Sequence, residues 1–146
     1  MNMTLPSVTI VRRIKAPPAK VYAALTEPTL MTQWWGADAG PTLSATADVR
    51  VGGRFSIVFQ TVDGSQHNPT GVYREVDPDK KLVFTWEWNS MPEWESLVTF
   101  VLKPFDGGTE LTLTHERLPD EDARKSHEGG WTGFVGKLQV FVGDFT

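Results

Sequence analysis

The segment 81-KLVFTWEW-88 places a large apolar side chain at every second position: Leu82, Phe84, Trp86 and Trp88. Thr85 and Glu87 stand between them. Because successive side chains of a β-strand point to opposite faces of its sheet, this spacing predicts a strand with one aromatic face and one more polar face. Such a strand is typical of an antiparallel sheet that is covered on one side only.

Turn-forming residues divide the chain around this segment into further strands. Asp63-Gly64 and Asp106-Gly107 are dipeptides typical of tight turns. The expected strands are residues 8–14, 53–61, 70–76, 81–88, 95–102 and 109–116, with a short extra strand over 42–49. Their short connections predict an antiparallel meander, in which His115 shares the apolar face of the last strand.

The N-terminal part is expected to supply two short helices. The segment 16-APPAKVYAALTEP-28 predicts a helix that begins at its prolines and stops before Pro28. A second helical turn follows around Trp34 and Trp35. We expect one of these two indoles in the core and the other at a pocket mouth or an interface, with the choice between them open.

A long helix is expected at the C-terminal end. Asp120, Glu121 and Asp122 favour a helix N-terminus, where carboxylates interact with exposed amides and with the positive end of the helix dipole. The apolar positions that follow recur at three- and four-residue steps, and they are His127, Trp131, Val135, Leu138 and Val142. This stripe predicts a helix that lies on the apolar face of the sheet.

Glycines are unusually frequent in this helix. Gly129, Gly130, Gly133, Gly136 and Gly143 lie within or beside it, although an interior glycine costs about 1 kcal/mol relative to alanine. Two compatible explanations are a close approach of the helix backbone to the strands and a bend at the first two glycines that lets the helix arch over a cavity.

The segment 127-HEGGW-131 begins like the zinc-protease signature His-Glu-x-x-His, but Trp131 stands where the second histidine is required. We therefore expect no metal and no cofactor here. His127 should face inward and pack on the Trp131 indole while it bonds a loop carbonyl or a ligand oxygen. Glu128 should lie at the helix edge in solvent. His67, in a loop beside Asn68, is expected to be exposed.

Composition limits the class of protein. The 146 residues are 40% hydrophobic and 22% charged with a formal charge of -4, which suits one globular domain over residues 1–146 and does not suggest a nucleic-acid-binding surface. The sequence has no cysteine, as is common in the cytoplasm, where we expect the protein. No apolar run approaches the ~20 residues of a membrane span.

Several motifs in this order resemble the family of the C-terminal domain of activators of the heat shock protein 90 ATPase, within the START-like and birch-pollen-allergen-like superfamily. They are 31-MTQWWG-36, 49-VRVGGRFSI-57, 71-GVYREVDPDKKLVFTWEW-88, 111-LTLTHE-116 and 127-HEGGWTGFVGKL-138. The resemblance runs from about residue 8 to 142. It implies an α+β helix-grip fold, in which a curved antiparallel sheet of about six strands wraps around a long C-terminal helix, with two short N-terminal helices and a hydrophobic cavity between sheet and helix.

Binding of a small apolar or aromatic molecule is the function that the sequence favours. Aromatic side chains from the sheet and the helix should converge, with a few polar groups to orient a ligand. The predicted pocket residues are Trp34, Tyr73, Phe84, Trp86, Trp88, Phe100, His115, His127, Trp131, Phe134, Val135 and Leu138. Each aromatic residue also has the alternative role of filling the core.

Two other functions remain open. A cyclase or hydrolase could use His115 or His127 as a general base, but Glu116 and Glu128 should each point away from the preceding histidine, so no catalytic residue is assigned. A co-chaperone role follows from the family name, although the resemblance covers only the C-terminal half of the known activators, whose N-terminal half makes the main chaperone contact. Pairing of two chains through exposed strand faces is also left open.

Overall fold

The computed structural model describes residues 5–34, 42–61, 63–88 and 91–143, with the backbone alone for 91–93. Its elements, in chain order, are β1 (Val8–Ile14), α1 (Pro18–Thr26), α2 (Pro28–Trp34), β2 (Thr42–Ala47), β3 (Arg54–Gln60), β4 (Gln66–His67), β5 (Thr70–Asp77), β6 (Lys81–Trp88), β7 (Met91–Phe105), β8 (Gly108–Glu116) and α3 (Glu121–Gly143). The α+β class, the two short N-terminal helices and the long C-terminal helix are confirmed.

The strands form one antiparallel sheet in the order β1-β8-β7-β6-β5-β3-β2, with β4 paired to β3. The meander is therefore confirmed, and β1 returns to pair with the last strand, so that Val8 lies opposite His115. The described part of the chain holds eight strands, more than the about six that the family resemblance implies, and β4 is the strand that the sequence pattern did not predict. The two-residue β4, which pairs with Phe59 and Gln60, is too short for an alternating pattern to reveal it.

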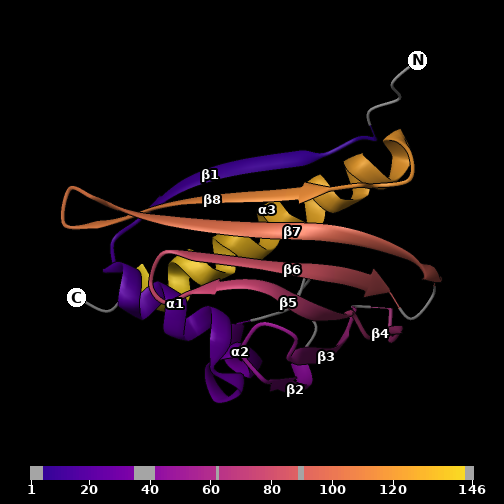
Figure 1. Cartoon of the computed structure of the whole chain (residues 1–146), viewed down its shortest axis with the longest axis horizontal. Coiled ribbons are helices and arrows are strands. Elements are labelled where there is room, and N and C mark those ends of the chain that lie inside the picture. The colour runs from indigo at the N-terminus through magenta and orange to yellow at the C-terminus, as the bar shows by residue number, and fades with distance from the viewer. Residues whose placement is uncertain (1–4, 35–41, 62, 89–90, 144–146) are drawn as a thin grey trace.

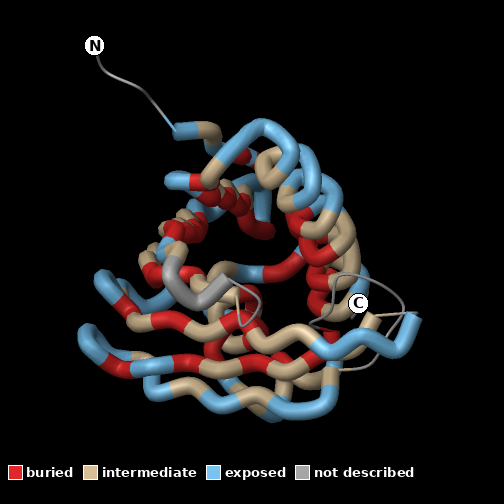
Figure 2. The backbone as a smooth tube through the Cα atoms, turned by 90° about the vertical axis from the view of Figure 1, so that its right-hand side faces the viewer, coloured by how far each residue is buried: buried red, intermediate tan, exposed pale blue. Residues whose placement is uncertain are grey.

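The sheet curls around α3, and α1 and α2 lie beside one end of it (Figure 1). Buried residues alternate with less buried ones along β8 and along the first half of β6, and buried and intermediate colours alternate along the strands in Figure 2. Leu82, Phe84 and Trp86 of β6 are each at most 4% exposed. The predicted apolar face is therefore confirmed, and it forms the core together with the helix.

Helix α3 begins as the sequence predicts. The Asp120 side chain caps it by accepting a hydrogen bond from the Ala123 backbone N–H at 2.8 Å. Its buried side chains are those of Trp131, Phe134, Val135, Leu138 and Val142, so the inward stripe is confirmed.

The helical glycines do not approach the strands closely at three positions. A Cβ atom added at Gly129, Gly130 or Gly136 would have no neighbour within 4 Å outside the helix, and at Gly143 it would lie 3.6 Å from the Lys15 backbone nitrogen. Close approach is therefore the wrong explanation for the first three, and the bend remains a prediction. A close approach occurs instead at Gly71 in the sheet, where a Cβ atom would lie 1.8 Å from the Thr85 carbonyl oxygen.

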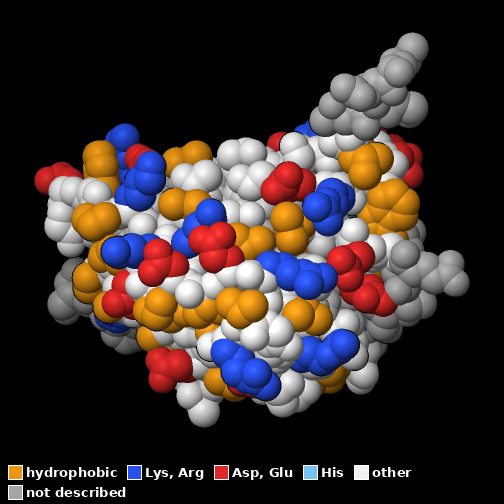
Figure 3. All heavy atoms as spheres, viewed as in Figure 1, with side chains coloured by type: hydrophobic (Ala, Val, Ile, Leu, Met, Phe, Trp, Pro, Cys, Tyr) orange, Lys and Arg blue, Asp and Glu red, His pale blue; other side chains and the backbone are white. Residues whose placement is uncertain are grey.

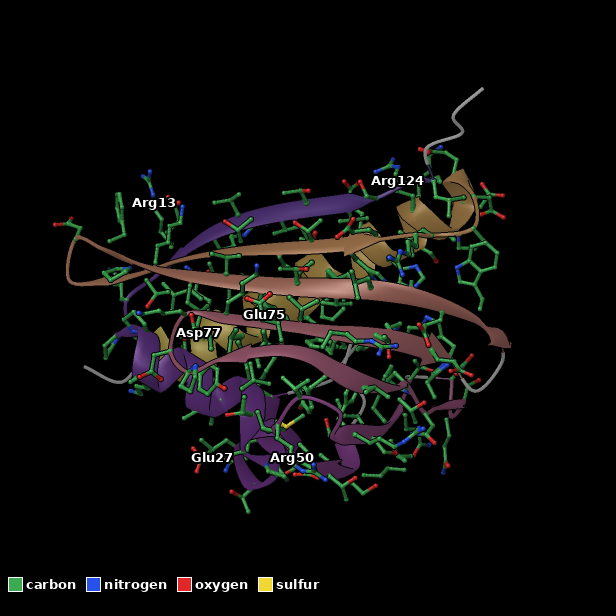
Figure 4. The ribbon with its side chains drawn as sticks, in the orientation of Figure 1. Arg13, Glu27, Arg50, Glu75, Asp77 and Arg124 are labelled. Carbon is green, nitrogen blue, oxygen red and sulfur yellow. The ribbon has the colours of Figure 1, made fainter. Side chains whose placement is uncertain are left out.

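The outer face of the sheet carries side chains of both charge signs, which lie interspersed in Figure 3. Lys81 and Glu75 pair across neighbouring strands at 3.4 Å. Arg13 and Arg124 lie at opposite ends of the β1 side of the molecule (Figure 4), and Arg124 pairs with Glu121 at 2.8 Å. Exposed ion pairs of this kind contribute about 0–1 kcal/mol each, so the fold depends on its aromatic interior.

Candidate functional site

A cavity of about 320 Å³ opens to the surface between β3, β4, β6 and α3. Its lining residues are Phe59, Thr61, His67, Trp86, Trp88, Ser126, His127, Gly130, Trp131 and Phe134. This volume lies at the lower end of the ~300–1,000 Å³ range of small-molecule sites. The lining is mostly aromatic, with polar side chains from β4, the end of β3 and the first turns of α3.

Aromatic rings from the sheet and the helix build the walls together. The Trp131 ring centroid lies 5.1 Å from that of Trp86 and 5.0 Å from that of Phe134. Trp86 in turn lies 5.3 Å from Trp88, nearly perpendicular to it. Such tilted and edge-to-face pairs stabilise aromatic clusters by about 0.5–1.5 kcal/mol each beyond simple burial, so the walls hold a defined shape.

His115 and Trp131 form one histidine–tryptophan pair, called here the inner pair. The Trp131 indole N–H donates to His115 Nδ1 at 2.8 Å. Ser96 Oγ donates to the Trp86 carbonyl at 3.1 Å, so its 2.6 Å contact with His115 Nε2 requires the imidazole to be the donor. The two contacts therefore define a neutral His115 with its proton on Nε2 and both ring nitrogens occupied.

His127 and Trp88 form a second pair, called the outer pair, at the cavity wall. The Trp88 indole N–H donates to His127 Nε2 at 2.9 Å, and His127 Nδ1 donates to the Ala123 carbonyl at 2.7 Å. The His127 and His115 rings lie edge to face at 4.8 Å. His127 was expected to pack on Trp131; it contacts Trp88 and His115 instead, because its ring points back along the helix toward Ala123.

Both imidazoles are held neutral. Burial lowers the pKa of His115 to about 3, with a smaller contribution from nearby His127. Burial also lowers the pKa of His127, and the hydrogen bond to the Ala123 carbonyl opposes that shift in part. In each neutral ring the lone pair already accepts an indole N–H. Neither histidine has a free nitrogen with which to remove a proton from a substrate.

No carboxylate supports either histidine in the described structure. Glu116 and Glu128 are exposed, and Glu128 lies 3.4 Å from Arg124 in an ion pair. The predicted position of Glu128 in solvent is therefore confirmed. Within the described ranges, no three side chains of His, Asp or Glu gather closely enough to hold a metal ion.

The indole rings of Trp88 and Trp131 offer no free N–H group to the cavity. Their N–H groups point into the histidine lone pairs, so the ring faces and carbon edges of Trp88 and Trp131 remain for contact with a bound molecule. The histidines thus keep the walls apolar although they are themselves polar residues.

Free hydrogen-bonding groups lie at the cavity mouth. His67 stacks on Phe59 with ring centroids 5.4 Å apart and meets Trp88 edge to face at 6.1 Å. Among the residues that the structure describes, neither the His67 ring nor the Ser126 hydroxyl has a hydrogen-bond partner, whereas Thr61 donates to Asp63 at 2.6 Å. His67 was expected to lie exposed in a loop; it is half-buried, because pairing of β4 with β3 holds it over Phe59.

Comparison with known proteins agrees with this architecture. Residues 15–143 match the family model described as "Activator of Hsp90 ATPase homolog 1-like protein". The chain belongs to this family. No curated protein matches the chain at a significant level.

Solved structures of bacterial proteins have the same fold. A protein of Mesorhizobium loti is 28% identical, with a TM-score of 0.77 over 97% of this chain and 99% of that one. A protein of Nitrosomonas europaea is 25% identical, with a TM-score of 0.80 over 97% and 96%. The solution structure of an AHSA1-like protein from Aeromonas hydrophila, 21% identical, has a TM-score of 0.79 over 94% and 92% and supports the fold alone.

The predicted pocket residues of this family member fall into three groups. Five of them line the cavity: Trp86, Trp88, His127, Trp131 and Phe134. His115 lies behind the wall and binds Trp131. The others lie deeper in the core: Tyr73, Phe84 and Phe100 surround a separate space of only about 10 Å³, and Val135 and Leu138 are at most 1% exposed.

Trp34 is also a core residue. It is 4% exposed, and its indole N–H donates to the Ala24 carbonyl at 2.9 Å. Its ring centroid lies 6.4 Å from that of Phe134, in an edge-to-face arrangement. Trp34 is thus an indole that lies in the core, and the expectation for Trp35 falls outside the described residues.

The sequence analysis missed the β3–β4 side of the cavity, which supplies Phe59, Thr61 and His67. It also missed Ser126 and Gly130 of α3. A signal for Phe59 was available, because Phe55, Ile57 and Phe59 alternate in β3. Nothing in the sequence marked Ser126, which is exposed on the surface of an amphipathic helix.

Proposed function

We propose that this protein binds a small aromatic molecule with one hydrogen-bonding group in the 320 Å³ cavity. The observation that carries the proposal is the division of the lining into an aromatic interior and a polar mouth. Trp86, Trp88, Trp131 and Phe134 would hold the ring system, while His67 and the Ser126 hydroxyl would meet its polar end. Ligand sites commonly combine a mostly apolar lining with a few placed polar groups.

Turnover with His115 or His127 as the general base is disfavoured by the state of these two histidines. A general base needs a free nitrogen and a pKa near the working pH, whereas His115 and His127 are neutral and doubly hydrogen-bonded. Burial of both rings also disfavours the charged form that would follow proton abstraction.

Two glycines of α3 offer a matched test. Gly130 lines the cavity and Gly129 is exposed, and a Cβ atom at either would meet nothing within 4 Å outside the helix. Gly130→Leu should fill the cavity, whereas Gly129→Leu adds the same side chain on the outside. Both changes should leave stability equal or slightly higher, because leucine is the better helix former by up to about 1 kcal/mol.

The probe is 2-naphthol, measured by isothermal titration calorimetry. We expect saturable binding to the native protein and to Gly129→Leu, and a loss of at least tenfold in affinity for Gly130→Leu. Equal binding to all three proteins would place the ligand elsewhere. Absence of binding to the native protein would contradict the proposal and favour a protein-interaction role instead. Co-precipitation with the Hsp90 chaperone is the direct assay for that role.

The polar mouth has its own test. His67→Phe keeps an aromatic ring against Phe59 but removes both ring nitrogens. This change should lower the affinity for 2-naphthol about fivefold, which corresponds to the loss of one net hydrogen bond of about 1 kcal/mol. Naphthalene has no hydroxyl group, so its affinity should not change. An equal loss for both compounds would mean that His67 acts by shape alone.

A further inference from the structure

A second cavity, of about 90 Å³, lies behind the outer pair. Its lining residues are Trp86, Trp88, Trp94, Ser96, Leu118, Pro119, Ala123 and His127. Three of these, Trp86, Trp88 and His127, also line the main cavity. The two spaces therefore share one wall, and the outer pair forms part of it.

The parts of this wall are not equally fixed. Trp86 is 1% exposed, and its carbonyl accepts the Ser96 hydroxyl in the centre of the sheet. Trp88 is half-buried and is the last residue of β6, just after a register irregularity between Trp86 and Trp88 in the pairing with β7. Its indole N–H is held by His127 alone among the described residues. Opening the wall would require rotation of the Trp88 side chain, loss of this one hydrogen bond, and separation of the indole from its ring contacts, among them Trp86 at 5.3 Å and Phe59 at 6.2 Å.

The second cavity is suited to an apolar group. Leu118, Pro119 and Ala123 contribute hydrocarbon surface. Two of its polar side chains are already paired, since the Trp94 indole N–H donates to the Arg117 carbonyl at 2.7 Å and Ser96 is bound to His115 and to the Trp86 carbonyl. A polar ligand group would gain no hydrogen bond from Trp94 or Ser96, whereas a hydrocarbon chain needs none.

We propose that this second cavity is a subsite for the apolar tail of a ligand whose aromatic ring occupies the main cavity. The inference rests on the proposed function and narrows it to ring compounds that carry an alkyl or similar apolar substituent. Such a tail would pass between Trp88 and His127 and lie against Leu118 and Ala123.

The test uses 4-alkylphenols with chains of two to eight carbons, titrated into the native protein and two variants. Ala123→Leu fills the second cavity from α3 without adding a side chain to the main cavity. Lys125→Leu adds a leucine at an exposed position of the same helix and is the matched control. Thermal unfolding of each variant is measured alongside.

In the native protein and in Lys125→Leu, affinity should rise about fourfold per added methylene group that the 90 Å³ space can bury and should level off for the longest chains. In Ala123→Leu the shortest phenol should bind as in the native protein, and the gain should stop once the tail reaches the filled space, with at least a tenfold loss for the octyl compound. An unchanged series in Ala123→Leu would overturn the subsite and leave the proposed function intact. Failure of even the shortest phenol and of 2-naphthol to bind the native protein would overturn both.

A measurement on the native protein keeps the test independent of whether Ala123→Leu folds. The Trp88 indole N–H, bonded to His127 Nε2 at 2.9 Å, gives a separate signal in a ¹⁵N-resolved NMR spectrum. Saturation with 4-octylphenol should shift this signal far more than saturation with 4-ethylphenol does. Equal shifts with both compounds would mean that the wall stays closed and would contradict the subsite.

Discussion

The two histidine–tryptophan pairs use the same chemistry in different surroundings. In each, a neutral imidazole accepts an indole N–H and donates its own proton to an oxygen. The inner pair is embedded in the core, with His115 at 0% and Trp131 at 3% exposure, while both members of the outer pair are half-buried. The difference teaches that one interaction type can serve in two places, a wall inside the core and a half-buried wall at the cavity.

Removal of the inner imidazole should have the largest effect. His115→Ala leaves the Trp131 N–H without its acceptor and creates a hole in the core, so we expect a loss of about 3–5 kcal/mol in the free energy of unfolding. Urea denaturation of the variant and the native protein measures it. A loss under 1 kcal/mol in the free energy of unfolding would mean that the inner pair does not stabilise the core.

The second largest effect should come from low pH, which acts on the free energy of unfolding through the inner pair. The pKa of His115 falls from its ordinary value of 6.5 to about 3 on folding, so between these pH values the unfolded chain binds one more proton than the folded protein. Stability from this group is therefore complete above pH 6.5 and declines by up to about 1.4 kcal/mol per pH unit as the pH falls toward 3.

The measurement is urea denaturation at pH 7, 6, 5 and 4 for the native protein and for His115→Phe. The groups that face His115 are the His127 imidazole, the Ser96 hydroxyl and the indoles of Trp131 and Trp86. His127 is therefore the other titrating group to consider. The variant should lose clearly less stability over this range than the native protein does. Parallel curves would show that His115 does not titrate on unfolding.

Removal of the outer imidazole should lower the free energy of unfolding by less than removal of the inner one. His127→Ala removes one hydrogen-bonded ring at a half-buried position, and we expect about 1–2 kcal/mol of destabilisation. The change can be followed by urea denaturation beside His115→Ala. Equal losses in the two variants would remove the distinction between the pairs.

A metal assay on the same variant is a further check on His127. Elemental analysis should find no stoichiometric zinc either in the native protein or in His127→Ala. Zinc present in the native protein and lost in the variant would revive a metal role for this residue.

The smallest effect is expected from Trp88→Phe. This change keeps an aromatic side chain in the wall and removes only the N–H donor, leaving a His127 nitrogen that water can reach from the cavity. Stability should change by about 1 kcal/mol or less, and binding of 2-naphthol should persist. A loss as large as that of His115→Ala would mean that the outer pair supports the fold.

The sequence predicted the elements whose periodicity is long and regular. Alternation in residues 81–88 and 109–116 and the stripe through Trp131 and Leu138 determine which faces meet, because one side of a sheet and one side of a helix must both be buried. The family motifs added the curl of the sheet around α3. These features depend on local pattern, which a single sequence carries.

The cavity was harder to predict because it depends on where two distant segments meet. His67 looked like a loop residue, yet two residues of β4 pairing bring it over Phe59. Phe100 looked like a pocket residue by alternation, but that pattern reports burial and does not separate filled core from cavity wall. The partners of the two histidines follow from tertiary register, and no spacing in the sequence encodes them.

The central claim is that the space between β3, β4, β6 and α3 receives an aromatic molecule with its polar end toward His67. The most direct test is to saturate the isotope-labelled protein with unlabelled 2-naphthol and to measure intermolecular nuclear Overhauser effects. The account predicts contacts from the naphthalene protons to the rings of Trp86, Trp131 and Phe134. Contacts confined to the outer face of the sheet, or none at saturating 2-naphthol, would contradict it.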